Sequence, residues 1–236
     1  MQRDNSRILV ISDTHFPYAH PDAIRFLDAV ANQFQVTRVV HIGDEVDGHS
    51  WSFHEHDPDL LSPGFELDRA RRLMRPLFER FPIVDVIESN HGSLPFRQAK
   101  AHGLPKGMIR TYREIIGAPQ GWRWHDELIL KLPDGSDVCF RHGMTKDPLK
   151  WAQTLAMHTV NGHFHEDFCV KYWATPRGTY WSMVVGCLID RGSLAYAYNK
   201  LNVKRPLLGC GLIINSLPYL CPMLTDERGR WTGVLP

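Results

Sequence analysis

The stretch VVHIGDEVD, Val39 to Asp47, joins an apolar segment to an acidic one. The apolar part is β-branched, which is typical of a buried strand, and the acidic part begins at Gly43-Asp44. In open α/β sheets, ligands bind in the crevice outside the carboxyl ends of the strands. The stretch therefore predicts an α/β fold with a polar site at one end of its sheet.

Comparable apolar segments recur along the chain and predict further strands. They are Ile8–Ile11, Ile83–Ile87, Leu128–Leu132, Val138–Phe140, Met157–Val160, Met183–Ile189, Leu194–Tyr198 and Leu212–Ile214. Helical periodicity is clearest over residues 66–81, where Pro76 is expected to kink or shorten the helix. Strands and helices alternate in the first half, whereas strands dominate the second half. We expect one α/β layered domain over residues 1–236, with a mixed or antiparallel second half.

Composition limits the classes of function. Lys and Arg number 27 against 26 Asp and Glu, so no global basic field exists and phosphate recognition must be local. Five cysteines without a C-x-x-C pair indicate reduced thiols, and the N-terminus lacks the apolar core of a signal peptide. Prolines interrupt the uncharged stretch 206–225, which predicts two short buried strands around a turn at Asn215-Ser216. We expect a cytoplasmic protein with no membrane contact.

Polar residues also follow four other predicted strands, as Gly43 to Asp47 follow the apolar part of the opening stretch. These groups are Asp13-Thr14-His15, Ser89-Asn90-His91, Arg141-His142-Gly143 and Asn161-Gly162-His163-Phe164-His165. In extended chain, His163 and His165 would point the same way about 6.6 Å apart, which lets each imidazole reach one of two adjacent metals. Carboxylate oxygen with imidazole nitrogen suits Mn²⁺, Fe or Zn²⁺.

In order along the chain, these motifs resemble those of the calcineurin-like metallophosphoesterases: D-x-H, G-D-x-x-D, an Asn-His pair, an isolated His-Gly and G-H-x-H. The set spans Asp13 to His165. The resemblance implies a layered α-β-β-α sandwich with mixed sheets and flanking helices. One motif departs from the family pattern, because Ser89 and Gly92 replace the usual glycine and acid around Asn90-His91. This departure raises the question of the local backbone shape and of what tunes His91.

The resemblance also implies a role for each site residue. One metal is expected on Asp13, His15 and His165, the other on Asn90, His142 and His163, with Asp44 bridging both. His91 would lie beside the leaving group, and Asp47 would orient it. The expected cofactors are two divalent transition metal ions, Mn²⁺ first and Fe or Zn²⁺ as alternatives.

Substrate contacts are less defined by the sequence. The long connection 48–64 carries Trp51, His54 and His56, and two further basic segments carry Arg97 and Arg177 beside aromatic residues. Basic groups next to aromatic faces suit phosphate contact with base stacking. They also suit lysine and arginine stems that lie along an ordinary packed surface. Of the two, the sequence favours nucleotide or nucleic-acid contact.

The expected function is metal-dependent phosphoester hydrolysis by a hydroxide bridged between two metals, acting as a phosphodiesterase on a nucleotide or nucleic acid. One alternative is a phosphomonoesterase resembling the protein serine/threonine phosphatases, although Asp47 precedes Gly48-His49 rather than the Arg-Gly of that group. Another is a non-catalytic scaffold of the same fold. The scaffold is disfavoured because every expected ligand is present.

Overall fold

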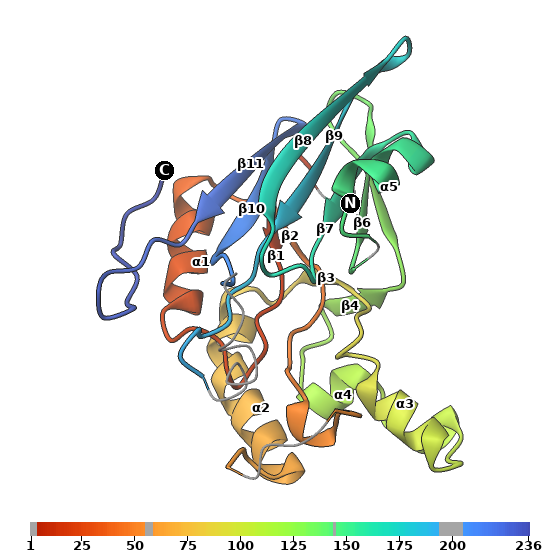
Figure 1. Cartoon of the computed structure of the whole chain (residues 1–236), viewed down its shortest axis with the longest axis vertical. Helices are drawn as coiled ribbons and strands as arrows, with labels where there is room; N and C mark the ends of the chain where they lie inside the picture. Colours follow the sequence, from red (N-terminus) through yellow and green to blue (C-terminus); the bar gives the residue numbers. More distant parts are fainter. Residues whose placement is uncertain (1–3, 55–58, 144, 194–204) are drawn as a thin grey trace.

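The computed structural model describes residues 4–54, 59–143, 145–193 and 205–236. Two β-sheets face each other at the centre of the molecule (Figure 1). The larger sheet has the order β11-β10-β1-β2-β3-β4. Its strands are β1 (Arg7–Ile11), β2 (Arg38–His41), β3 (Val84–Ile87), β4 (Trp122–His125), β10 (Gly209–Ile214) and β11 (Leu217–Pro222). β1 to β4 run parallel, and β10 and β11 extend the sheet in antiparallel pairing.

The smaller sheet has the order β5-β6-β7-β9-β8. Its strands are β5 (Leu128–Lys131), β6 (Asp137–Arg141), β7 (His158–Asn161), β8 (Phe168–Thr175) and β9 (Gly178–Val185). β6, β7 and β9 are parallel, and β5 and β8 are antiparallel edge strands. Both sheets are therefore mixed, as expected.

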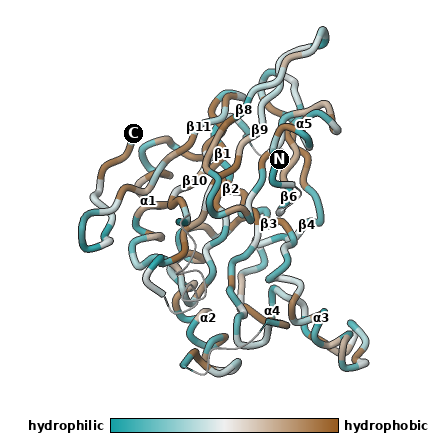
Figure 2. Tube along the Cα trace, in the orientation of Figure 1, coloured by the Kyte–Doolittle hydropathy of each residue, from teal (hydrophilic) through white to brown (hydrophobic). Residues whose placement is uncertain are grey.

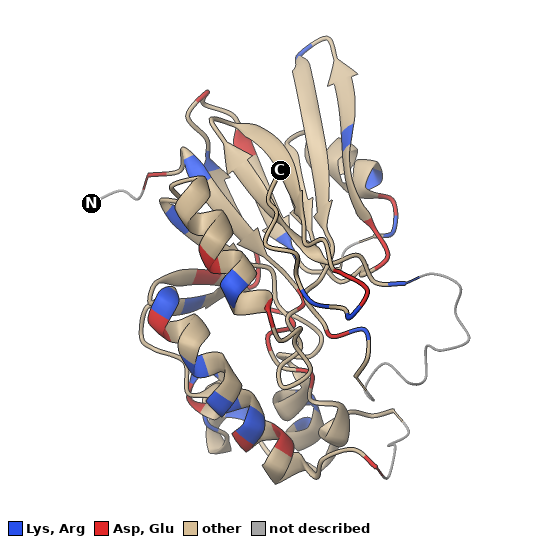
Figure 3. Ribbon diagram, turned by 90° about the vertical axis from the view of Figure 1, so that its left-hand side faces the viewer, with Lys and Arg blue, Asp and Glu red and all other residues tan. Residues whose placement is uncertain are grey.

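Within the described residues, five α-helices flank the sheets or extend beyond them. They are α1 (Ala23–Gln33), α2 (Pro63–Arg80), α3 (Leu94–Ala101), α4 (Tyr112–Ile116) and α5 (Pro148–Leu155), with short 3₁₀ turns η1 (His49–Trp51) and η2 (Lys106–Met108). α1 and α2 pack on the larger sheet and α5 packs on the smaller one. The result is an α-β-β-α sandwich. Basic and acidic residues are interspersed along the helices, whereas the strands carry few charges (Figure 3).

The period-two alternation of β1 divides the interior into two hydrophobic layers. Leu9 and Ile11 pack towards α1 and α2, and Ile8 and Val10 pack against the second sheet. All four are almost completely buried. Figure 2 shows the strands as the main hydrophobic part of the chain. Because both faces of β1 are covered, it is a continuous apolar run in sequence.

Several expected elements differ from the observed ones. α2 continues past Pro76 to Arg80, so the predicted shortening was wrong. Pro76 has no amide proton for the carbonyl of Arg72. Both residues are exposed, so water can bond to that carbonyl instead. The predicted pair around Asn215-Ser216 is confirmed as β10 and β11, and both turn residues have positive φ. The predicted strand at residues 194–198 lies outside the described residues.

Among the described residues, no helix is both long enough and apolar enough to cross a membrane. The fold instead directs the carboxyl ends of β1, β2, β3, β6 and β7 towards the same region. The polar segments that follow these strands form the candidate site.

Candidate metal centre

Residues from all five polar segments meet where the two sheets approach each other. They are Asp13, His15, Asp44, Asn90, His91, His142, His163 and His165. In each of three overlapping groups, the ligand atoms lie within 4.8 Å of one another and could hold a metal ion. The first group is Asp13, His15 and His165, the second is Asp44, His142 and His163, and the third, between them, is His15, Asp44 and His91.

The first group joins the segment after β1 to the segment after β7. His165 Nε2 lies 3.0 Å from Asp13 Oδ1 and 3.2 Å from His15 Nε2. His15 Nε2 is 3.8 Å from the same Asp13 oxygen. Three donor atoms thus face a common point.

The second group is centred on His142, which follows β6. Its Nε2 atom lies 2.8 Å from Asn90 Oδ1, 3.1 Å from Asp44 Oδ2 and 3.2 Å from His163 Nδ1. Asp44 Oδ2 is also 3.8 Å from His15 Nε2 in the first group. The Asp44 carboxylate therefore stands between the two groups.

These distances fit the donor set of a divalent transition metal. Donors bonded at 2.0–2.2 Å to one ion lie about 3 to 3.6 Å from one another in octahedral or tetrahedral geometry. Imidazole nitrogens and carboxylate oxygens suit Mn²⁺, Fe or Zn²⁺. The closest approaches in both groups match this spacing.

Two of the imidazoles are oriented through their second ring nitrogen. His15 Nδ1 donates to Asp47 Oδ1 at 2.8 Å, and His142 Nδ1 donates to the carbonyl of Ile42 at 2.6 Å. Such bonds fix the tautomer and direct Nε2 into the site, as is usual for metal-bound histidine.

This arrangement changes the expected role of Asp47. Its carboxylate pairs with His15, and His91 Nδ1 donates instead to the main-chain carbonyl of Asp47. Asp47 therefore orients His91 through its backbone rather than through its side chain. His91 Nε2 lies 3.9 Å from Asp44 Oδ2, and the side chain is one-quarter exposed.

The two histidines of the last motif lie on a turn rather than in extended chain. β7 ends at Asn161, His163 has φ of 71°, and the His165 amide donates to the His163 carbonyl at 3.2 Å. The argument from strand alternation was therefore wrong about the conformation. The turn nevertheless places one imidazole in each group.

Left-handed backbone is concentrated at the site. Asp13, His15 and Asp44 have φ values of 51°, 49° and 54°, which non-glycine residues rarely adopt. Strain of this kind persists where the surrounding structure enforces it, and it clusters at functional sites. A Cβ atom on Gly162 would lie 2.1 Å from Ser12 Oγ and 2.9 Å from Asp13 Oδ2, so only glycine fits there.

Two serines organise the centre and were not identified from the sequence as site residues. Ser12 Oγ donates to Asp13 Oδ2, leaving Oδ1 towards the histidines. Ser89 Oγ accepts the amides of Asp44 at 3.0 Å and Gly92 at 3.1 Å. The substitution of serine for the usual glycine therefore ties two of the site segments together. The place of Ser89 directly before Asn90-His91 is the sequence feature that could have identified it.

Buried carboxylates and imidazoles in the centre shift each other's pKa values. Burial alone would raise the pKa of Asp44, but His142 and His91 outweigh it and hold that pKa below its usual range. Burial would lower the pKa of His142, but the facing Asp44 carboxylate raises it to about 9. For His163, burial and the neighbouring His142 hold the pKa below its usual value. The buried carboxylate is thus ionised and requires positive charge beside it.

Comparison with solved structures identifies the fold. Vacuolar Protein Sorting 29 from Cryptosporidium parvum is 13% identical, and the match covers 98% of this chain and 94% of that one with a TM-score of 0.50. The chain has the calcineurin-like metallophosphoesterase fold. An archaeal phosphodiesterase is 14% identical over 91% of this chain and 99% of that one, with a TM-score of 0.47. The phosphoesterase Yfce from E. coli is 12% identical over 96% of each chain, with a TM-score of 0.43.

No protein-family model matches the sequence, and no curated protein matches it. The fold is evident from the structure, and the polar motifs occur in the order that the resemblance predicts.

Within this fold, the candidate substrate residues lie in different places. Trp51 is half-buried against the core, and its carbonyl accepts a bond from Gln98 Nε2 at 2.7 Å. His54 is exposed beyond η1, and the Arg97 guanidinium lies over the Phe53 ring at 5.2 Å. His56 lies outside the described residues.

Arg177 is not brought to the candidate metal centre. It lies in the turn between β8 and β9, at the amino end of β9, whereas the candidate ligands follow the carboxyl ends of the parallel strands. The hairpin projects from the body of the sandwich (Figure 1). Its eight-residue strands separate Arg177 from the centre.

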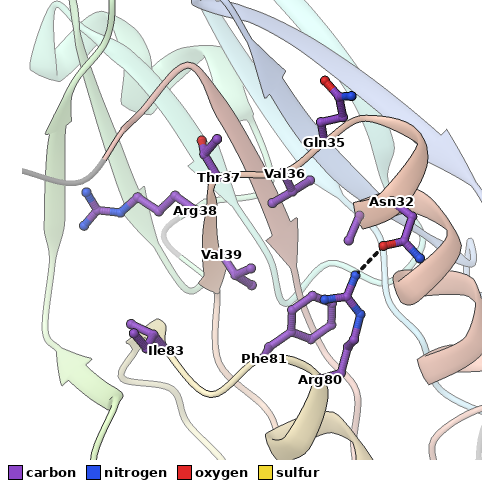
Figure 4. Close-up of a pocket in the computed structure, with 10 residues that line it drawn as sticks. Asn32, Gln35, Val36, Thr37, Arg38, Val39, Arg80, Phe81 and Ile83 are labelled. Atoms are coloured by element: carbon purple, nitrogen blue, oxygen red, sulfur yellow. Dashed lines mark hydrogen bonds between the residues drawn. The ribbon is translucent and has the colours of Figure 1, made fainter.

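A further cavity of about 520 Å³ lies at the opposite, amino end of β2 (Figure 4). Arg80 Nη2 donates to Asn32 Oδ1 at 2.7 Å beside it, and Arg80 also pairs with Asp28. Arg38 pairs with Asp85 at 2.7 Å. Because both arginines are already neutralised, this cavity offers no strong anion site.

Proposed function

We propose that the chain is a metal-dependent phosphoester hydrolase, and specifically a phosphodiesterase that acts on a nucleotide or nucleic acid. The position of Asp44 supports this most directly. One of its oxygens lies 3.1 Å from His142 Nε2 and 3.8 Å from His15 Nε2, between two groups that could each hold an ion.

The proposed ligands follow from this geometry. Asp13, His15 and His165 would hold one ion, Asn90, His142 and His163 the other, and Asp44 would contact both. Two divalent ions, of which Mn²⁺ is the expected species, would lower the pKa of a shared water and neutralise charge on the phosphoryl oxygens. The buried carboxylates and oriented imidazoles would hold that charge in place before substrate arrives.

His91 is proposed to protonate the leaving oxygen. Its Nδ1 proton is engaged by the Asp47 carbonyl, which directs Nε2 towards the centre. Partial exposure gives this ring access to an incoming ester. An alkoxide leaves poorly without a proton, and a positioned general acid typically contributes about 10² to 10⁴ in rate.

A paired assay tests the function. Metal-stripped protein is assayed on bis-p-nitrophenyl phosphate and p-nitrophenyl phosphate, with Mn²⁺, Fe²⁺, Zn²⁺ or Mg²⁺ added back. We expect metal-dependent hydrolysis that favours the diester and is lost in Asp44→Asn. Preference for the monoester would favour the phosphatase alternative, and inactivity on both with every ion would favour a non-catalytic scaffold.

A further inference from the structure

Positive charge is concentrated in the segment 89–113, which begins at the centre and includes α3 and η2. The segment contains five basic residues and no carboxylate: Arg97, Lys100, Lys106, Arg110 and Arg113. The whole chain has a formal net charge of only +1, so this local excess is unusual within it. A local excess of this kind is what phosphate recognition would need in a chain without a global basic field.

The positive charges of this segment are only weakly offset by nearby carboxylates. Among the described residues, none of them forms an ion pair, and four of the five residues are exposed. α2 differs, because Arg71 lies 3.4 Å from Asp68 and Arg80 pairs with Asp28. The basic residues of α2 are thus partly neutralised by ion pairs. In the segment 89–113, Lys106 interacts with Glu88 only at longer range, as Arg110 and Arg113 do with Glu114.

A cavity of about 570 Å³ connects this segment to the metal centre. Its lining includes Asn90, His142 and His163 from the centre and Ser93, Phe96 and Lys106 from the basic segment. An ester held at the centre would therefore extend past the start of α3 towards η2.

The same cavity is also lined by Glu88 and Asp126. Their carboxylates repel phosphate but accept hydrogen bonds from sugar hydroxyls or base amino groups. A bound nucleotide would therefore favour phosphate near Lys106 and its neutral part near the two carboxylates.

Aromatic rings accompany the cations on both sides of α3. Lys106 Nζ lies 5.1 Å from the centre of the Phe96 ring, and the Arg97 guanidinium lies 5.2 Å from that of Phe53. Phe53 is 53% exposed. Cations that follow a backbone, together with aromatic faces for stacking, suit single-stranded nucleic acid, whose bases are accessible, better than a duplex.

We propose that α3 and η2 form a binding surface for a single-stranded oligonucleotide that extends from the metal centre. The inference rests on the proposed function for the position of the scissile phosphate. It adds that neighbouring phosphates contact Arg97 and Lys106, so the substrate is a strand and not an isolated mononucleotide.

The test is fluorescence anisotropy with labelled single strands of 2, about 6 and about 12 nucleotides in EDTA, which separates binding from cleavage. Arg97→Gln/Lys106→Gln is compared with Arg72→Gln/Arg75→Gln, a matched loss of two charges on exposed positions of α2. We expect affinity to increase with length. A plot of log K against log salt should become less steep by about 1.4 in the first variant, which is about 0.7 for each of two lost phosphate contacts. Its slope should be unchanged in the second variant.

Equal slopes in the two double variants, or affinity independent of length, would overturn the proposal. Displacement of the strand by anionic lipid vesicles with higher affinity would also overturn it, in favour of a membrane surface. Failure of the proposed function is distinguishable, because it appears as inactivity on bis-p-nitrophenyl phosphate while strand binding persists.

Discussion

His15 Nε2 and His165 Nε2 lie 3.2 Å apart, although the two residues are 150 positions apart in the sequence. Both imidazoles face Asp13 Oδ1, at 3.8 and 3.0 Å. Two imidazole lone pairs at this separation repel each other unless a proton or a cation lies between them. The folded chain therefore maintains an arrangement that a metal ion would stabilise.

Replacement of Gly162 is expected to disrupt this arrangement by displacing Ser12 and Asp13. Gly162→Ala places a Cβ atom 2.1 Å from Ser12 Oγ, and overpacking typically costs about 1–3 kcal/mol. Displacement of Ser12 should also weaken metal binding, because Ser12 holds Asp13. Gly107→Ala is the control, since no atom lies within 4 Å of its new Cβ. Thermal unfolding and metal titration should separate the two variants, and equal behaviour would contradict the close approach.

Ser89→Ala tests the serine that replaces the family glycine. Loss of Oγ leaves the amides of Asp44 and Gly92 without their acceptor, which should lower the free energy of unfolding by about 2 kcal/mol. Metal affinity should fall as well, because Asp44 loses one of the bonds that hold it to the segment of Asn90. The bond from the His91 amide to Asp44 Oδ1 at 3.2 Å remains. Ser136→Ala, in the turn between β5 and β6, should change stability by less than about 0.5 kcal/mol. A comparable loss in both variants would show that Ser89 has no special role.

His91→Ala tests leaving-group protonation. Both metals should be retained, and hydrolysis of a dinucleotide should slow by about 10² to 10⁴. Bis-p-nitrophenyl phosphate should lose much less rate, because p-nitrophenolate leaves as an anion. Since His91 Nε2 also lies in a group with His15 and Asp44, metal content must be measured alongside. Loss of a metal, or equal losses on both substrates, would assign His91 a different role.

Asp22 connects the C-terminal segment to the start of α1. Its carboxylate accepts from Arg230 at 2.6 and 2.7 Å and from the Trp231 amide at 3.1 Å. The Arg230 hydrogen bonds hold the pKa of Asp22 below its usual range. Because the folded pKa is lowered, this contribution to stability is present above the ordinary Asp value of about 4 and is lost as the pH falls through the folded value.

Asp22→Asn should therefore lower the free energy of unfolding by about 1–2 kcal/mol near neutral pH, after allowance for the exposed Arg230. The difference from the native chain should begin to shrink below about pH 4. Urea unfolding across this range provides the measurement. A difference that stays constant with pH would mean that the ion pair contributes nothing.

The sequence predicted much of the framework because its strands are buried on both faces. β1 is a continuous apolar run after Arg7, and β2 contains the apolar pair Val39-Val40. The polar residues after both strands lie where parallel strands end. β4 and β8 were missed because Arg123 and Lys171 interrupt their apolar residues. Strands that are partly exposed resemble surface segments in a single sequence.

The contacts within the site were less predictable than its composition. Motif order indicated which histidines and carboxylates would meet, but not that Asp47 pairs with His15 or that His163 lies on a turn. Such details depend on backbone conformations that tertiary packing enforces. The cavity between His142 and Lys106 likewise depends on the docking of α3, which no local pattern specifies.

Metal stoichiometry tests the central claim most directly. The native chain and Asp44→Asn are stripped, reconstituted with Mn²⁺, freed of excess ion and analysed for bound metal and protein. We predict two ions per native chain and weaker binding of both ions in Asp44→Asn, because the bridging carboxylate loses a charge that each cation uses. No more than a trace of metal in the native chain, repeated with Fe²⁺ and Zn²⁺, would contradict a two-metal centre.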